Sequence, residues 1–375
     1  MCLTKKFQNQ YNFTLIQGFQ LSSRFYENFD RALSYLKRLV IRYLVLKEGP
    51  SRQLFLDEVQ PNLDFEVVMK FSDNSFIEHF NKVNCFAECH AFESRYLIDA
   101  RNIKIDTKTG LIFDQRSTVV SESSSWPADR ILLSSPYVPR ACTSALEQTK
   151  SDYLILPSNG FYHWLIEDLA PFLFALRNSK GPTKVLYFRD APRYVLDLVR
   201  ELPIQSVEMP RGVQLSKIRF VTRGPDTGWP LKEDILELRN FFASSLQLVN
   251  SAKKIYISRL KSTRSPEFEK GLVEILEREG WKILHLEDLS VKEQIIEFSS
   301  ASIVCGVHGA GLSGIVWMDS NTKVIELSPR GRHVPCFSRL SSRLGIQHEL
   351  VIFEEPSNEI GALQIFKIIQ SKSNY

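Results

Sequence analysis

Residues 253–287 read KKIYISRLKSTRSPEFEKGLVEILEREGWKILHLE, and this stretch decides the fold class. The run at 253–259 has the apolar centre of a buried strand. Residues 266–280 carry apolar side chains at helical spacing between Pro266 and Gly280, which are typical of a helix start and a helix end. Residues 281–287 return to a strand pattern. This order predicts two neighbouring parallel strands, because parallel strands need a crossover connection.

The same alternation continues to the end of the chain. Strand patterns lie at 302–307, 323–329 and 348–354, and helical patterns lie at 291–301, 309–318, 336–344 and from about 359. Five strands therefore alternate with five helices. This count predicts a doubly wound parallel sheet.

A second α/β pattern precedes the first. Its strands are expected at 152–158, 184–190 and 217–223, and its helices at 163–177 and 194–201, which predicts another, smaller parallel sheet. GPDTGWP (224–230) between the patterns is typical of a linker. We expect an α/β protein with two Rossmann-like domains facing across a cleft, at 1–228 and 229–375. Residues 1–145 show few clear patterns.

Composition excludes several classes of protein. The 375 residues are 43% hydrophobic and 24% charged, unlike a disordered, collagen-like or fibrous chain. A net charge of +4 is too small to predict a nucleic-acid partner. Residues 298–318 contain no charged side chain, yet their glycines and serines favour a buried strand and a turn over a membrane helix.

The N-terminal region and the cysteines bear on location. The first residues lack the apolar run of a secretory signal, and the six cysteines form no tight framework, so a reducing, cytoplasmic location is expected. The basic amphipathic stretch at 31–49 predicts either a surface helix or an element on an anionic membrane. Cys85, Cys89 and His90 resemble half a zinc site, but two buried thiols on a helical turn fit as well.

The first candidate site is GVHGAGLSG (306–314), where a strand pattern meets a helix pattern. Its glycines would let backbone N–H groups approach a phosphate or diphosphate, with His308 at the edge, although glycines needed only for packing explain the turn equally well. Arg259 and Arg264 leave the first strand of the same sheet and could converge on that anion, or they could be solvated. Glu326 at the next strand could bind a ribose diol, or it could cap a helix or be solvated.

The second candidate site is NGFYHWLIEDL (159–169). His163 and Glu167 lie four residues apart on one predicted helix face, and Asp168 lies about 100° further round. A carboxylate there can act as general base towards a hydroxyl, with the imidazole orienting it. Acidic residues that favour the start of a helix are the alternative.

HWLIEDLAPFL, ISRLKSTR and VHGAGLSGIVWM followed by VIELSP, in this order, make residues from about 152 to 329 resemble glycosyltransferase family 61. The resemblance implies an inverting transferase of the two-domain GT-B architecture, with the nucleotide-sugar donor on the C-terminal sheet. It implies His163 and Glu167 as catalytic residues, with Asp168 ranked behind them. The donor-binding residues that we expect are Arg259, Arg264, His308, Gly309, Ala310, Gly311, Leu312 and Glu326.

These expectations combine into one hypothesis. Glu167 takes the acceptor proton in a single displacement while His308, Arg259 and the glycine turn stabilise the departing diphosphate. No cofactor or metal is expected, because the chain has no Asp-x-Asp sequence. The expected partners are a nucleotide sugar and a glycan or lipid-linked acceptor, as in soluble bacterial members that build surface polysaccharides, with peripheral association at the inner membrane face. A non-catalytic nucleotide-binding or assembly protein and a phosphoester hydrolase are the alternatives.

Overall fold

A computed structural model of the chain describes the residues on which the fold and the site depend. The described residues are 65–72, 78–79, 89–90, 95–113, 123, 144–145, 152–179, 181–202, 204–210, 212–223, 227–228, 230–246, 253–262, 264–330, 334–353 and 359–373. The chain divides into two compact units, and all of these residues lie in the unit that comprises Ser51–Ala128 and Val138–Tyr375.

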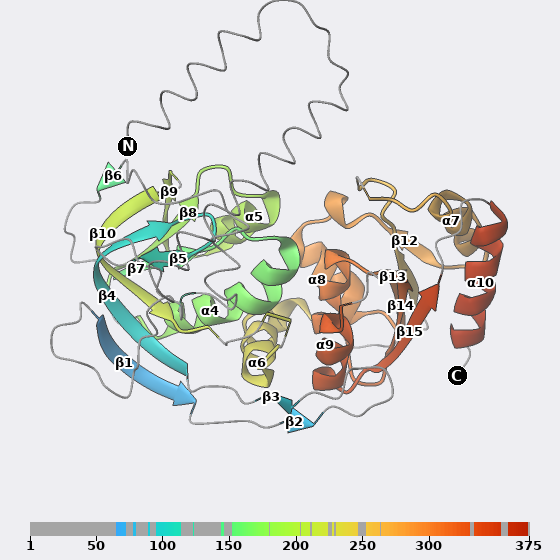
Figure 1. The fold of residues 1–375 in the computed structure, drawn as a ribbon. Helices are drawn as coiled ribbons and strands as arrows, with labels where there is room; N and C mark the ends of the chain where they lie inside the picture. Colours follow the sequence, from blue (N-terminus) through green and yellow to red (C-terminus); the bar gives the residue numbers. More distant parts are fainter. Residues whose placement is uncertain are drawn as a thin grey trace, which may run out of the picture. The chain divides into compact units, whose positions relative to one another are not determined.

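The C-terminal third contains the predicted five-stranded parallel sheet (Figure 1). Its strands lie in the order β12-β11-β13-β14-β15, and every neighbouring pair is parallel. The strands are β11 (Lys254–Ile257), β12 (Lys282–Leu284), β13 (Ile303–Val307), β14 (Lys323–Pro329) and β15 (Gln347–Phe353). The helices between and after them are α7 (Glu269–Arg278), α8 (Val291–Ser299), α9 (Cys336–Leu344) and α10 (Glu359–Ser373). The alternation read from the sequence is confirmed.

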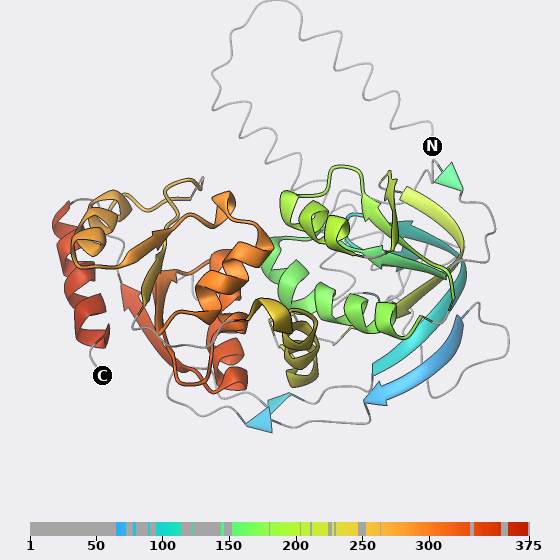
Figure 2. The same ribbon diagram turned by 180° about the vertical axis from the view of Figure 1, so that it is seen from behind.

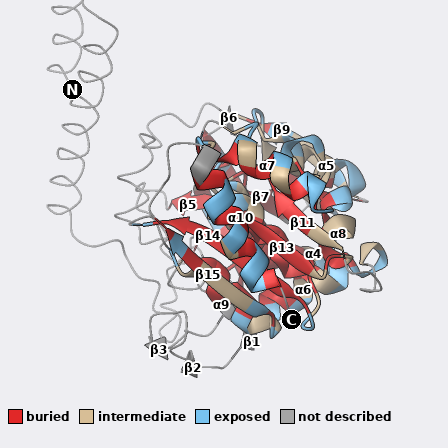
Figure 3. Cartoon of the chain, turned by 90° about the vertical axis from the view of Figure 1, so that its right-hand side faces the viewer, coloured by how far each residue is buried: buried red, intermediate tan, exposed pale blue. Residues whose placement is uncertain are grey.

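Helices cover both faces of this sheet (Figure 2). Because side chains alternate along a strand, Tyr256 packs with α7 and α10 on one face, whereas Ile255 and Ile257 pack with α8 and α9 on the other. The strands are buried and the outer side of α10 is exposed (Figure 3). Each large apolar side chain buried in this way stabilises the fold by about 1.5–3 kcal/mol.

The uncharged stretch at 298–318 does not form a single helix. It comprises the end of α8, strand β13 and a 3₁₀ helix, η5 (Ala310–Trp317), which contradicts a membrane-spanning reading and corrects our expectation of an α-helix after the glycine turn. No helix among the described residues is long and apolar enough to cross a bilayer.

A smaller parallel sheet precedes these elements, as expected, but one of its strands differs from the prediction. Its strands are β7 (Asp152–Leu156), β8 (Thr183–Phe188) and β9 (Gln205–Met209). The sequence indicated 217–223 as the third strand, whereas those residues fall largely within β10 (Gly212–Val221) of a different sheet. QSVEM in β9 is half-exposed and has no apolar run, so hydropathy did not reveal it.

The sheet that contains β10 is mixed. β10 pairs antiparallel with β4 (Arg95–Asp106) and parallel with β6 (Ser144–Ala145), while β1 (Phe65–Ser72) and β5 (Leu111–Phe113) pair antiparallel with β4. Apolar side chains of β4 and β10 pack against one face of β7–β9. The other face of β7–β9 carries α4 (Leu169–Arg177) and α5 (Arg193–Glu201). β1 has the sequence FEVVMKFS.

Five further elements lie elsewhere in the described chain. They are α6 (Lys232–Phe241), the 3₁₀ turns η3 (Ala243–Ser245) and η4 (Leu286–Asp288), and the strand pair β2 (Glu78–His79) and β3 (Cys89–His90). The predicted basic helix at 31–49 lies outside the described residues. Cys85 does too, and the side chains of Cys89 and His90 are not described, so the zinc alternative also falls outside them.

Candidate active site

The helix that follows β7 carries the first group of functional residues. It begins at Phe161 and contains a π-helical turn, η2 (His163–Asp168), before it continues as α4. Trp164, Leu165 and Ile166 are buried in the core and fix this turn against β7. π turns inside α-helices are rare and occur frequently at functional sites.

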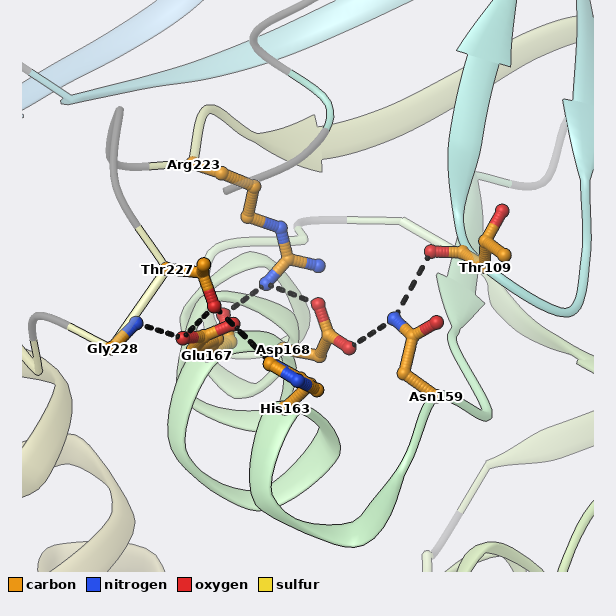
Figure 4. A network of polar contacts seen from close by, with 8 residues as sticks. All are labelled: Thr109, Asn159, His163, Glu167, Asp168, Arg223, Thr227 and Gly228. Carbon is orange, nitrogen blue, oxygen red and sulfur yellow. Dashed lines mark hydrogen bonds and ion pairs between the residues drawn. The ribbon is translucent and has the colours of Figure 1, made fainter. Parts of the chain in front are cut away.

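His163 and Glu167 form a hydrogen-bonded pair on this turn (Figure 4). Nδ1 of His163 lies 2.8 Å from Oε2 of Glu167. The other carboxylate oxygen accepts hydrogen bonds from the Thr227 hydroxyl, at 2.7 Å, and from the Gly228 N–H, at 2.6 Å. Both oxygens of Glu167 are therefore occupied by partners from this chain.

The two members of the pair differ in exposure and in basicity. The His163 side chain is 32% exposed and that of Glu167 is 7% exposed. Burial opposes the charge on His163, but the hydrogen bond and charge of Glu167 outweigh it and hold the pKa of His163 above its ordinary value. Burial would raise the pKa of Glu167, yet His163 and the donors from 227 and 228 bring that pKa below its ordinary value.

Asp168 belongs to a separate internal network. Its Oδ2 accepts from the Asn159 amide at 2.6 Å, and its Oδ1 lies 3.4 Å from Arg223, which also donates to the Glu167 carbonyl. Asn159 donates in turn to the Thr109 carbonyl (Figure 4). Burial raises the pKa of Asp168 to about 6, although the charge of Arg223 opposes this. A carboxylate enclosed in this way braces the turn, and this corrects our assignment of Asp168 to the catalytic group.

The second group of functional residues lies where β11 and β13 end. The strand order of this sheet reverses between β11 and β13, and open α/β sheets bind ligands outside the carboxyl ends of the strands at such a point. Arg259 follows β11, and its Nη1 donates to the His308 carbonyl after β13 at 3.0 Å. His308, Gly309 and Gly311 are partly exposed, and Ala310 is exposed.

Gly309 brings the backbone close to the guanidinium. A Cβ at this position would lie 3.4 Å from Nη1 of Arg259, so the absence of a side chain keeps the arginine against the turn. Arginine suits oxyanions because its planar donors contact two oxygens at once. Arg259 therefore lies against the glycine turn, and its contact with an anion there stays a prediction.

The aromatic ring of Phe337, at the start of α9, links the two groups of residues. The ring centroid of Phe337 lies 5.5 Å from that of Tyr162 and 5.2 Å from that of His308. Tyr162 in turn lies edge-on to its neighbour His163, with 5.4 Å between the ring centroids. The histidine–carboxylate pair and the glycine turn are therefore parts of one region of the molecule.

Comparison with known proteins is consistent with this geometry. The glycosyltransferase 61 family model matches residues 161–325, a segment that contains His163, Glu167, Arg259 and His308. Over these residues the chain is similar to glycosyltransferase family 61. The family resemblance read from the motifs is thus confirmed. No curated protein matches the chain. A solved structure of a dipicolinate synthase chain from Bacillus halodurans shares 11% sequence identity, covers 59% of this chain and 80% of its own, and has a TM-score of 0.19, too low to carry an argument.

Several residues of the family 61 glycine motif serve packing. A Cβ at Gly314 would lie 2.2 Å from the Phe298 ring, and one at Gly311 would lie 3.0 Å from Leu286. The Leu312 side chain is 1% exposed and lies in the core, which corrects its assignment to the donor site. The packing alternative therefore holds for these positions, and the ligand-binding alternative is retained for 308–310.

Two further donor-site candidates lie apart from the expected contacts. Glu326 is fully buried, and hydrogen bonds from His308 and His348 occupy its two oxygens. A ribose contact and a solvated role are both inconsistent with this burial. Arg264 is exposed, and its backbone N–H donates to the Ser262 hydroxyl, but the structure does not bring its side chain to the family 61 glycine turn.

Sequence reasoning missed several residues of the site. Thr227 and Gly228 lie in the segment that we identified only as a linker, and their contacts with Glu167 depend on the fold. Phe337 and His348 lie in a helix and a strand that carry no recognisable motif. The serine-rich sequence of α9 and the histidine of β15 did not indicate that Phe337 and His348 lie near His308.

Proposed function

We propose that the protein is an inverting glycosyltransferase that moves a sugar from a nucleotide-diphosphate donor to an acceptor hydroxyl. One observation carries this proposal: Phe337 contacts His308 beside the glycine turn and also Tyr162, the neighbour of the His163–Glu167 pair. The ring of Phe337 thus connects the candidate anion site at His308 with Tyr162, which lies against the candidate proton acceptor His163. An inverting transfer needs both groups at the same anomeric carbon.

The geometry favours His163 as the general base, in place of our first choice, Glu167. A base must reach the acceptor hydroxyl, and His163 is the more exposed member of the pair. Glu167 has both oxygens occupied and a lowered pKa, so it is a weak proton acceptor. A buried carboxylate that holds Nδ1–H leaves Nε2 as the nitrogen that faces a substrate, as in catalytic triads.

The proposed reaction is a single displacement. His163 takes the proton of the acceptor hydroxyl while the hydroxyl oxygen forms a bond to one face of the anomeric carbon. The bond from that carbon to the diphosphate oxygen breaks on the opposite face, and the electron pair leaves with the diphosphate. Arg259, His308 and the backbone of the glycine turn stabilise the added negative charge.

The parallel sheet supports placing the donor at the carboxyl ends of β11 and β13. A GT-B arrangement of two domains, at 1–228 and 229–375, with the acceptor on the N-terminal side is part of the proposal. A glycan or lipid-linked acceptor, a role in surface polysaccharide synthesis and a cytoplasmic site at the membrane face follow the family resemblance. The buried free thiols Cys305 and Cys336 are compatible with a reducing compartment.

A nucleotide screen tests the proposal. The purified chain is melted with UDP, GDP, CMP and TDP in the presence of EDTA, and a ligand at 100 times its Kd adds about 2.7 kcal/mol. We expect one nucleotide to raise the melting temperature. Turnover of the matching sugar nucleotide then distinguishes a transferase, which gives a glycoside, from a hydrolase, which gives free phosphate. Binding without turnover would support the non-catalytic alternative, and a folded protein that binds none of the four would contradict the donor site.

A further inference from the structure

A buried carboxylate joins two histidines behind the glycine turn. Glu326 in β14 is fully buried. Its Oε1 lies 2.5 Å from Nδ1 of His308, and its Oε2 lies 2.9 Å from Nε2 of His348 in the neighbouring strand β15. Nδ1 of His348 lies 2.9 Å from the Ser341 hydroxyl in α9. The four side chains form a continuous chain of hydrogen bonds.

The chemistry of these groups fixes the direction of each hydrogen bond. An ionised carboxylate only accepts, so both histidines must carry a proton on the nitrogen that faces Glu326. Neutral His348 then has Nε2–H, and its Nδ1 accepts from the Ser341 hydroxyl. His308 has Nδ1–H, so any contact that it makes with a ligand is made through Nε2.

Because Glu326 is buried, the fold itself requires its hydrogen bonds with His308 and His348. A buried charge is costly unless it is paired and hydrogen-bonded. Burial would raise the pKa of Glu326, but the hydrogen bonds from His308 and His348 bring it below its ordinary value, so the carboxylate stays ionised.

Other charged or titratable groups also face this region. Arg259 contacts the His308 carbonyl from the loop after β11, and Cys336 lies close to Glu326 at the start of α9. Burial and the nearby Glu326 raise the pKa of the Cys336 thiol to about 12, so it remains neutral. Glu326 is the anion that is hydrogen-bonded to His308, and Arg259 is the cation beside it.

We propose that Glu326, His348 and Ser341 are positioning residues that hold His308 with Nε2 towards the leaving diphosphate. This inference rests on the proposed function and deepens it. The Nδ1–H of His308 is hydrogen-bonded to Glu326, so a protonated His308 donates its Nε2–H to a diphosphate oxygen. That hydrogen bond opposes the negative charge that develops on the leaving group.

Nitrogen NMR of the histidines tests this chain of hydrogen bonds without any ligand. The neutral forms are observed at high pH in the wild type, and His308→Gln and His348→Gln spectra assign the signals. We expect the proton on Nδ1 in His308 and on Nε2 in His348. His308 with its proton on Nε2 alone would overturn the proposal, whether or not a nucleotide binds.

The nucleotide affinity of a Glu326 variant tests the consequence for the donor site. UDP and GDP are titrated into the full wild-type chain and into Glu326→Gln. The affinity of Glu326→Gln should fall by about 10-fold, because the residue that orients His308 is changed. An unchanged affinity in a folded variant would overturn the proposed positioning role.

Variants of His348 and Ser341, the members of the hydrogen-bonded chain that do not contact His308, separate a positioning role from a general effect on stability. His348→Leu should weaken nucleotide affinity by about 10-fold, and His348→Gln, which keeps an N–H donor, should restore most of it. Ser341→Ala should shift the His348 signals. The matched control is Ser338→Ala, which removes a buried hydroxyl of α9 that bonds the Pro335 carbonyl and should leave these signals unchanged. Equal effects of the two serine variants on the His348 signals would contradict the proposed chain of hydrogen bonds. Failure of the wild type to bind either nucleotide would contradict only the proposed function.

Discussion

Nδ1 of His163 lies 2.8 Å from Oε2 of Glu167, and the carboxylate is the more buried partner, at 7% exposed against 32%. The exposed imidazole can reach a substrate, and the buried carboxylate can hold it. The same division of roles occurs at His308 and Glu326, whose side chains are 18% and 0% exposed. Two histidines, each held by a buried carboxylate, therefore belong to the region around Phe337.

His163→Gln should lower kcat by about 10²- to 10⁴-fold, the usual contribution of a general base. In the wild type, kcat/KM should rise with pH through the pKa of His163, which lies above 6.5, because only the neutral ring accepts a proton. In Glu167→Gln the rise of kcat/KM should occur at lower pH, because the carboxylate that raises the pKa of His163 is removed. Nucleotide binding should change little in both variants. Near-normal turnover in His163→Gln with none in Glu167→Gln would return the base to Glu167.

The His163–Glu167 pair should also give a pH-dependent stability. The pKa of His163 is raised, so its contribution is fully present below pH 6.5 and is lost as the pH rises through the raised value. The pKa of Glu167 is lowered, so its contribution is present above pH 4.5 and is lost as the pH falls through the lowered value. The melting temperature of the wild type should exceed that of Glu167→Gln most between pH 4.5 and pH 6.5. Glu208→Gln, at the exposed pair with Arg189, is the control and should show no such window.

The mixed sheet should depend on the buried carboxylate of Asp99, which pairs with Arg219 and with Lys217. Arg219 in β10 contacts Asp99 in β4 through two hydrogen bonds, of 2.7 Å and 2.9 Å. Asp99→Asn should destabilise the chain by about 3–5 kcal/mol, because a buried guanidinium loses its counter-charge. Asp288→Asn removes an exposed partner of Lys261 and should leave the free energy of unfolding nearly unchanged. Denaturant unfolding of the two variants measures the difference, and equal losses would contradict the prediction.

Gly314→Ala should destabilise the C-terminal sheet through overpacking. The added methyl group would lie 2.2 Å from the buried Phe298 ring, and overpacking of this kind costs about 1–3 kcal/mol. Phe298→Leu in the same chain should recover part of the loss by making room. Gly181→Ala meets no atom within 4 Å and is the matched control for thermal melting. A Gly314→Ala protein as stable as the wild type would contradict the packing role of this glycine.

Transfer should not need a divalent metal. The Arg259 guanidinium, which contacts the His308 carbonyl, provides positive charge at the proposed diphosphate site. Activity with a sugar nucleotide should therefore persist after dialysis against EDTA. A loss that Mn²⁺ restores would contradict the proposed use of protein cations in place of a metal.

The sequence by itself determined the local order of the chain. Alternating strand and helix periods predicted all five strands of the C-terminal sheet, and Pro266 and Gly280 marked the helix between β11 and β12, because these signals arise within a few neighbouring residues. The same reasoning placed His163 with Glu167 and Arg259 with the glycine turn. It gave no sign of β9, which has no apolar run, or of the antiparallel pairing of β10 with β4.

Only the tertiary structure decided which carboxylates are enclosed by partners from the chain. The sequence placed Asp168 on a helix and Glu326 at a strand end, but packing buries both and supplies Asn159 and Arg223 to one, and His308 and His348 to the other. Burial and hydrogen bonding depend on partners distant in the chain, so they leave no local pattern. For the same reason, the contacts of Gly228 with Glu167 and of Phe337 with His308 emerge only once the sheets have packed.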